Sequence, residues 1–381
     1  MKKLLLPLVV TTLISSVAQA DLLVGTYTAG TSQGIYRYAF DSQTGQIAAQ
    51  PTQTVKSENP SWLTLSHDQK HLFAVNENGP GQADVVGRVS SFAIDASHAI
   101  SPINEVDSKG DEPTHSSLAK GEGYLFVSNY AVHPDPGGRL SVLPVKANGE
   151  LGEVIQQEAH EASKVNPERQ ASSHVHSVVS APNGHDVYLQ DLGADRIFLY
   201  KFDPKNAAHP LTAAKTPEVI LAPGSGPRHL TFSKDGKHAY LTLEMAAQVA
   251  VFDVRSDGFL IQKQLLDMAK GKPQEGKGGG AIHLSPDGKF LYATNRGNTN
   301  ELIAYAVAAN GQLKEIQRRS VEGKEPREFT FDPSGKFLLI ANQKSSQIVV
   351  VRHDAKTGKL GETVQKFDID TPSDLKFLAG K

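Results

Sequence analysis

One stretch of the sequence decides the fold: Gly280-Ala281-Ile282-His283-Leu284-Ser285-Pro286-Asp287-Gly288-Lys289-Phe290-Leu291-Tyr292-Ala293-Thr294-Asn295. It is a short apolar run, a turn and a second apolar run, which predicts a β-hairpin. The turn position recurs at Gln69, Glu122, Gly184, Gly236, Gly288 and Gly335, so successive copies lie 53, 62, 52, 52 and 47 residues apart. Strand repeats of about this length are typical of propeller blades, which are four-stranded sheets that cannot bury their faces alone.

A seventh copy is divided between the two ends of the chain. Residues 371–378 match the first strand of the hairpin, and the sequence ends before a second strand. The missing strand is predicted at residues 22–27, and its pairing with residues 371–378 closes the ring without an unpaired sheet edge. We therefore predict an all-β, seven-bladed β-propeller in which the N-terminal strand completes the last blade.

The first twenty residues have the pattern of a signal peptide. Lys2 and Lys3 precede an apolar stretch at 4–14, and Ala18-Gln19-Ala20 has the small residues of a signal-peptidase site. The apolar stretch is too short to remain as a membrane anchor. We predict cleavage after Ala20, a periplasmic or secreted protein without membrane attachment, and one propeller domain over 21–381.

Charge and cysteine content exclude other classes of function. Loss of Lys2 and Lys3 takes the formal net charge from −2 to about −4, so no nucleic-acid partner is expected. The chain has no cysteine, which excludes thiolate chemistry and disulfides. The sequence has no paired histidine or cysteine spacing typical of a metal site, and we expect neither metal nor cofactor.

Hairpin geometry predicts where a functional site lies. The start of the first strand and the end of the second lie together, opposite the turn. We call the position eight residues before the turn the leading slot and the position eight after it the trailing slot. The leading slot holds Ser61, Thr114, His176, Arg228, Gly280, Arg327 and Ser373. The trailing slot holds Tyr27, Glu77, Tyr130, Leu192, Glu244, Arg296 and Gln343.

Several of these side chains are charged, although packing between blades does not require charge. Buried arginine, histidine or glutamate costs desolvation unless a partner is present. We predict that His176, Arg228, Glu244 and Arg296 face one another as a catalytic cluster, with an anion site beside a base. From the same region we predict three substrate-binding residues: Arg327, Glu77 and His115.

Structural roles compete with these functional ones. Arg228 and Glu244 stand at the two ends of one hairpin and can form a salt bridge within a blade. Arg327 can pair with Glu325 or Glu328 at the rim.

Histidines inside strands are often structural. His229 and His283 fit that description, and His115 shares the register of His229. A structural role for His115 therefore stands beside the predicted role in substrate binding.

One connection is longer than the others. The 62-residue spacing is absorbed by residues 158–173, which lead into the strand of His176 and must cross the face that carries the slots. Long loops on such a face often contact ligands. Glu168, Arg169 and His174 are therefore further predicted substrate-binding residues.

The sequence resembles the seven-bladed propeller lactonase family, which includes the propeller type of 6-phosphogluconolactonase and is similar to fungal carboxy-muconate cyclases. The resemblance covers essentially the whole chain after residue 20. It rests on Leu23-Val24-Gly25-Thr26-Tyr27-Thr28, Pro167-Glu168-Arg169-Gln170, His174-Val175-His176, Asp191-Leu192-Gly193-Ala194-Asp195-Arg196-Ile197, Pro223-Gly224-Ser225-Gly226-Pro227-Arg228-His229, Ile282-His283, Asn295-Arg296-Gly297 and Pro326-Arg327-Glu328-Phe329.

The resemblance implies hydrolysis, or reversible closure, of a sugar or organic-acid lactone. The catalytic histidine, arginine, glutamate and second arginine of the cyclase branch match His176, Arg228, Glu244 and Arg296. Asp191, which opens one of the matching motifs, joins the substrate-binding candidates.

A hydrolytic mechanism follows from these residue types. Water attacks the carbonyl of a small, anionic lactone, His176 or Glu244 takes its proton, and Arg228 and Arg296 stabilise the oxyanion. Because 6-phosphogluconolactone is made and used in the cytoplasm, we expect an exported enzyme to act on another lactone. The alternatives are a muconate-type lactonising cycloisomerase and a non-catalytic periplasmic propeller that binds a protein or glycan.

Overall fold

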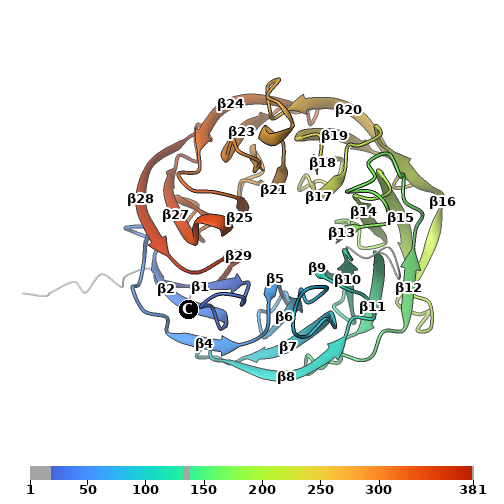
Figure 1. The fold of residues 1–381 in the computed structure, drawn as a ribbon, viewed down its shortest axis with the longest axis horizontal. Helices are drawn as coiled ribbons and strands as arrows, with labels where there is room; N and C mark the ends of the chain where they lie inside the picture. Colours follow the sequence, from blue (N-terminus) through green and yellow to red (C-terminus); the bar gives the residue numbers. More distant parts are fainter. Residues whose placement is uncertain (1–18, 132–137, 380–381) are drawn as a thin grey trace, which may run out of the picture.

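Seven antiparallel sheets stand around a central axis in the computed structural model, which describes residues 19–131 and 138–379 (Figure 1). Their innermost strands contact one another in an unbroken circuit, from β5 through β9, β13, β17, β21, β25 and β29 back to β5. The predicted seven-bladed propeller is confirmed. No helix in the described part of the chain is long and apolar enough to cross a membrane.

Six sheets have four strands, which follow one another in sequence from the inside of the ring outward. Their bounds are β5 (Pro60–Leu65), β6 (His71–Asn76), β7 (Arg88–Ile94), β8 (Ile100–Asp107); β9 (Pro113–Leu118), β10 (Tyr124–Asn129), β11 (Arg139–Pro144), β12 (Gln156–Ala159); β13 (Val175–Ser180), β14 (Asp186–Asp191), β15 (Arg196–Phe202), β16 (Leu211–Ile220); β17 (Pro227–Phe232), β18 (His238–Leu243), β19 (Gln248–Val254), β20 (Leu260–Asp267); β21 (Gly279–Leu284), β22 (Phe290–Asn295), β23 (Glu301–Val307), β24 (Leu313–Ser320); β25 (Pro326–Phe331), β26 (Phe337–Asn342), β27 (Gln347–His353) and β28 (Leu360–Asp368). Two short 3-10 helices, η1 (Gln274–Gly276) and η2 (Gln343–Ser345), lie in connections.

The seventh sheet joins the two ends of the chain, as the sequence predicts. It contains β29 (Pro372–Leu378), β1 (Gln19–Thr26), β2 (Gly34–Asp41), β3 (Gln46–Ile47) and β4 (Gln53–Lys56). Leu22 lies opposite Phe377, and Val24 lies opposite Leu375. The predicted cleavage point falls just inside β1, where Ala20 pairs with Phe40, and the rest of the predicted signal peptide, residues 1–18, lies outside the described residues.

The hairpin turns share one backbone conformation. All six predicted turn positions have positive φ, including the non-glycine residues Gln69 (55°) and Glu122 (57°). At each one the backbone N–H donates to the carbonyl three residues earlier, as Gly288 does to Ser285 at 2.8 Å. The gapless alignment of the repeats is therefore confirmed at the level of the backbone.

The hydrophobic core lies between the faces of neighbouring sheets. Tyr188 and Leu199, for example, pack in one cluster with Leu241 and Phe252 of the next sheet. Alternating apolar side chains on both faces of each sheet supply these layers, since a single sheet in a stack has no solvent-facing side.

A β-bulge interrupts the innermost strand of each blade at the leading slot. Pro60 pairs with Asn76 and Trp62 with Val75, so Ser61 has no partner of its own, and the register shifts at the equivalent point of the other six blades. A bulge re-aims side chains locally. The leading-slot residue and its successor can therefore both approach the channel, as the 5.2 Å separation of the His176 and His229 rings shows.

Candidate active site

Equivalent hydrogen bonds place the two slots beside each other in all seven blades. The backbone N–H of each trailing-slot residue donates to the carbonyl two residues before the leading slot. In two blades this bond joins Glu244 to Gly226 and Arg296 to Gly278, each at 2.6 Å. The predicted convergence of strand ends on one face is confirmed.

Glu244 is the centre of the cluster on this face. Its Oε2 atom lies 2.7 Å from Nη2 of Arg296, 3.2 Å from Nε of Arg228 and 3.7 Å from Nε2 of His176. Its Oε1 atom accepts a hydrogen bond of 2.6 Å from Nη2 of Arg169. We call these five residues the Glu244 cluster. The structure thus brings the four predicted catalytic residues together, and the salt bridge of Arg228 with Glu244 within one blade is part of the same arrangement.

Arg169 reaches the cluster from the long loop at residues 158–173. Its Nη2 atom also donates to the Tyr130 hydroxyl at 3.1 Å. The Tyr130 ring stacks on His174, with ring centres 4.6 Å apart, and meets His176 edge to face. Tyr130 is a trailing-slot residue that was absent from the predicted site, although the slot count alone could have included it.

The electrostatic setting keeps Glu244 ionised. Burial by itself would raise the pKa of this carboxyl, but the positive charge of Arg296, together with those of Arg169 and Arg228, holds it well below its usual range. Burial and the nearby charge of Arg296 lower the pKa of Arg228 to about 9, so this guanidinium remains charged at neutral pH. A carboxylate held this firmly by cations is a poor proton acceptor.

His176 is the candidate base instead. Burial, followed by the charge of Arg228, lowers its pKa well below 6.5, so the ring is neutral at pH 7. Its Nε2 atom faces Glu244, and its buried Nδ1 atom has no hydrogen-bond partner among the described residues. This arrangement leaves the lone pair of Nδ1 available.

Arg327 and Glu77 form a second pair at the mouth of the channel. Nη2 of Arg327 lies 3.2 Å from Oε2 of Glu77, which also accepts a 2.7 Å hydrogen bond from the Tyr27 hydroxyl. The Arg327 guanidinium lies over the Tyr27 ring at 5.1 Å. The predicted alternative, in which Arg327 pairs with Glu325 or Glu328, is wrong, because the side chain reaches over Tyr27 of the adjacent blade to Glu77 of the next one.

Three predicted substrate-binding residues do not join the site. The Glu168 side chain is exposed, and its backbone only caps a turn made by Asn166. Asp191 is fully buried and accepts hydrogen bonds from the Ser173 hydroxyl and the His174 backbone, so it anchors the loop. His115 lies one layer deeper in the channel, because it follows its leading slot rather than occupying it.

Glycine at position 280 makes room for Arg296. A Cβ atom at Gly280 would lie 3.4 Å from Cγ of Arg296 and would collide with the Thr294 hydroxyl. Arg296 therefore crosses the place that a leading-slot side chain fills in other blades, and reaches both Glu244 and Glu325, the latter at 3.1 Å. Gly280 provides no leading-slot side chain in this blade, and the Arg296 side chain fills the space.

A pocket of about 290 Å³ opens beside the cluster. Asn166 and Arg169 of the long loop form one side, and Gln274 and Lys277 of a second connection form another. Glu325 also lines it, as the residue two before the leading slot. Sequence reasoning missed these residues because connections have no repeat to align, whereas the position of Glu325 could have been counted.

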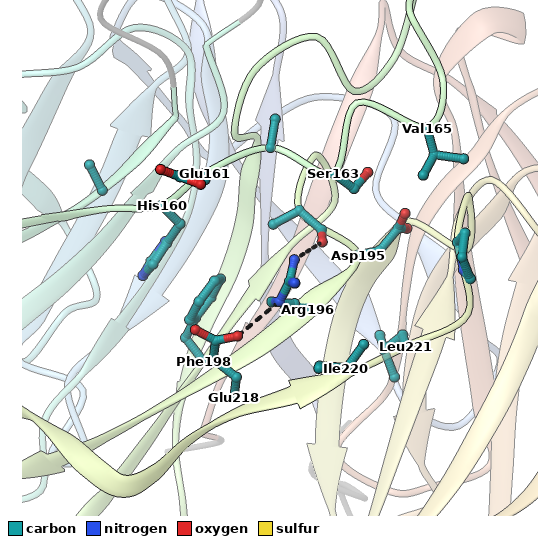
Figure 2. A pocket seen from close by; sticks show the side chains of 14 residues that line it. His160, Glu161, Ser163, Val165, Asp195, Arg196, Phe198, Glu218, Ile220 and Leu221 are labelled. Carbon is teal, nitrogen blue, oxygen red and sulfur yellow. Dashed lines mark hydrogen bonds and ion pairs between the residues drawn. The ribbon is translucent and has the colours of Figure 1, made fainter.

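A larger pocket, of about 520 Å³, lies away from the cluster, between the outer strands of two blades (Figure 2). Its central cation, Arg196, donates to the Ala194 carbonyl at 3.0 Å and pairs with Glu218 at 2.9 Å. None of the predicted catalytic residues lines it. Among residues 19–131 and 138–379, no group of three or more histidine or acidic side chains could hold a metal ion.

Comparison with known proteins places this geometry in context. The family described as lactonase, 7-bladed beta-propeller, matches residues 21–377. A 6-phosphogluconolactonase of Formosa agariphila is 34% identical over 350 residues, which cover 91% of this chain and 95% of the relative. A 6-phosphogluconolactonase of Bacillus subtilis is 29% identical over 357 residues, 93% of this chain and 97% of the relative. The structure of a periplasmic gluconolactonase of Pseudomonas aeruginosa is 50% identical and superposes with a TM-score of 0.92 over 95% of this chain and 100% of that one.

Proposed function

Because the chain belongs to the seven-bladed β-propeller lactonase family, we propose that it hydrolyses a small sugar or organic-acid lactone at the Glu244 cluster. One observation carries the assignment to this cluster. A buried, neutral His176 with an unpartnered Nδ1 atom stands beside an ionised Glu244 that is surrounded by arginines. Such a base, paired with fixed positive charge, is what acyl transfer to water requires.

In the proposed mechanism a water molecule at Nδ1 of His176 attacks the carbonyl carbon of the lactone and gives its proton to that nitrogen. Glu244, 3.7 Å from Nε2, stabilises the imidazolium that forms, as the carboxylate does in a hydrolase triad. Arg228 and Arg296 stabilise the negative charge on the former carbonyl oxygen. The bond from the carbonyl carbon to the ring oxygen then breaks, and His176 returns the proton to that oxygen, which gives the open hydroxy acid.

We also propose that the substrate carries an anionic group in the 290 Å³ pocket. Lys277 lines this pocket with Arg169 and Arg296, and it forms no ion pair with a carboxylate of the described residues. A phosphate or carboxylate on the lactone would supply the missing partner.

The proposed location is the periplasm, after removal of residues 1–20. The pattern of the N-terminus supports it, together with the 50% identity to a periplasmic gluconolactonase. The substrates to be tested therefore share a lactone ring. They need not be phosphorylated metabolites of the cytoplasm.

The test is acid release from a panel of lactones by the protein that comprises residues 21–381. The panel contains D-glucono-1,5-lactone, its 6-phosphate and a muconolactone, and the variants are His176→Asn and, as a matched control, the exposed His185→Asn. We expect wild type and His185→Asn to exceed the spontaneous rate and His176→Asn to lose about a hundredfold or more. Full activity of His176→Asn, or no wild-type activity on any lactone, would overturn the proposal, and the second result would favour a binding protein.

A further inference from the structure

The channel contains a second pocket, of about 470 Å³, which opens on the face that carries the hairpin turns. Two turn residues, His67 and Glu122, line its mouth. Deeper in, it is lined by residues one and three positions after the leading slot, such as Trp62, His115 and Lys376. The lining of this pocket meets the Glu244 cluster at His229, whose ring contacts both His176 and Arg228.

Ionisable groups are buried around this pocket and are already paired. Nε2 of His283 donates to Oε1 of Glu328 at 2.5 Å, and Nζ of Lys376 lies 2.8 Å from Oδ1 of Asp374. Both carboxylates are buried, with at most 1% of the residue exposed. Each of these cations has its own counter-charge, so the pocket has no surplus positive charge with which to hold an anion.

A purely structural channel would not need these groups. Replacing buried ion pairs by apolar side chains is often neutral or stabilising, because desolvation cancels the attraction. The other oxygen of Glu328, Oε2, is buried without a hydrogen-bond partner in the described structure, and Nδ1 of His229 stays 3.9 Å away. The Ser117 hydroxyl, which lines the pocket, is also unpartnered. Glu328 does not itself line the pocket, whereas the unpartnered Ser117 hydroxyl does, next to Thr64 and Thr231, and a wall of hydroxyl side chains fits a ligand that carries hydroxyl groups.

Flat rings form the other part of the wall. Trp62 and His115 lie 4.3 Å apart, and Nε1 of Trp62 donates to the Ser116 carbonyl at 3.1 Å, which fixes the indole. Lys376 lies over the Trp62 ring at 4.3 Å. Rings held in place next to small hydroxyl side chains fit a ligand that has both C–H faces and hydroxyl edges.

We propose that this pocket is a second binding site, for an uncharged sugar ring. The paired cations leave no surplus positive charge to hold an anion, the Ser117 hydroxyl exchanges hydrogen bonds with a ring hydroxyl, and Trp62 with His115 covers the apolar edge of the ring. The site does not depend on the reaction proposed for the Glu244 cluster.

Trp62 is the only tryptophan in the chain, so the fluorescence of the protein reports directly on this pocket. The experiment titrates the protein of residues 21–381 with D-glucose and D-galactose, and in parallel with gluconate and inorganic phosphate. We expect a saturable change in fluorescence with a pyranose and none with the two anions. The lack of a saturable change with either pyranose, or a change with an anion alone, would overturn the proposal.

Substitutions locate the response. Ser117→Leu fills the pocket and is expected to weaken sugar binding about tenfold or more; Thr231→Leu, also in the lining, serves if the first variant does not fold. Thr330→Leu is the matched control, since Thr330 holds the same position in a blade outside the pocket. Arg169→Met changes the Glu244 cluster and should leave the titration unaltered. A response that survives Ser117→Leu, or one that Arg169→Met removes, would contradict a site in this pocket.

Discussion

Nη2 of Arg169 lies 2.6 Å from Oε1 of Glu244, although 75 residues separate the two along the chain. Arg169 belongs to the long connection at residues 158–173, whereas Glu244 follows a regular strand. The loop therefore supplies one of the cationic partners of the Glu244 carboxylate, and the propeller blades supply the others.

Removal of this contact should affect activity more than stability. In Arg169→Met the Glu244 carboxylate keeps two arginines but loses a charged hydrogen bond, and we expect kcat/KM for a cleaved lactone to fall about tenfold to a hundredfold. The Arg169 side chain is 44% exposed, so the urea midpoint should hardly move. The control is Arg196→Met, which breaks an equivalent ion pair with Glu218 far from the cluster. Equal activity of both variants would argue against a role for the loop.

Replacement of Glu244 by glutamine should lower both the activity and the stability of the protein. The change leaves three guanidinium groups around a neutral amide, and uncompensated buried charge costs about 3–5 kcal/mol of unfolding free energy. Glu218→Gln breaks a pair in which the carboxylate side chain is 44% exposed, and should cost less than about 1 kcal/mol. Equilibrium unfolding in urea measures the two losses. Similar losses would mean that the Glu244 cluster is more hydrated than its burial indicates.

The rate should fall in acid only at an unusually low pH. His176 acts as a neutral ring, and burial together with the charge of Arg228 places its pKa well below 6.5. Protonation removes the base, so kcat/KM should stay constant as pH falls through 6.5 and decline only as pH approaches the lowered pKa. A pH–rate profile with its acid limb at 6.5 or above would rule out the neutral, buried His176 as the base.

Stability should depend on pH through three buried histidines. Burial lowers the pKa of His115, His176 and His229 well below 6.5 in the folded protein. Below about pH 6.5 the unfolded chain therefore binds more protons than the folded one, and each histidine removes about 1.4 kcal/mol of stability per pH unit until its folded pKa is reached. Above about pH 6.5 this loss is absent, and the stability that the neutral histidines allow is fully present. Urea unfolding between pH 7 and 5 should show this decrease in the free energy of unfolding. His176→Gln should reduce the slope against pH by the equivalent of about one proton.

Replacement of Gly280 by alanine should impair the site, although glycine contributes no side chain to it. The new Cβ atom would collide with the Thr294 hydroxyl and lie 3.1 Å from the Pro326 carbonyl oxygen, so the backbone at Gly280 must shift, and Arg296, which donates to the Gly279 carbonyl, should be displaced with it. We expect kcat/KM to fall at least about tenfold, in line with the loss of a charged hydrogen bond. Gly123→Ala, where nothing lies near the added atom, is the control. An active Gly280→Ala enzyme would show that Arg296 can reach Glu244 by another path.

Several features of the site were open to prediction because they lie on the repeat. The count from Gly288 predicts that His176, Arg228, Glu244 and Arg296 converge, since hairpins of equal length bring equal positions to one face. Glu168 and Asp191 lie outside the Glu244 cluster, and neither occupies a slot. Glu168 stands in an irregular loop, whose fold depends on contacts that no periodicity encodes, and Asp191, at the end of β14, anchors that loop.

The sequence alone therefore determined the number of blades, the closure of the ring by its two ends and the face that carries the charged residues, because strand periodicity and turn chemistry act over a few residues. Only the tertiary structure decided which charges pair. Arg327 reaches over Tyr27 to Glu77, Arg169 crosses from a loop to Glu244, and Arg296 passes over Gly280. Arg327 and Arg169 thereby join parts of the chain that are distant in sequence, whereas Arg296 crosses its own hairpin, and side-chain reach and burial select among partners that the repeat leaves equivalent.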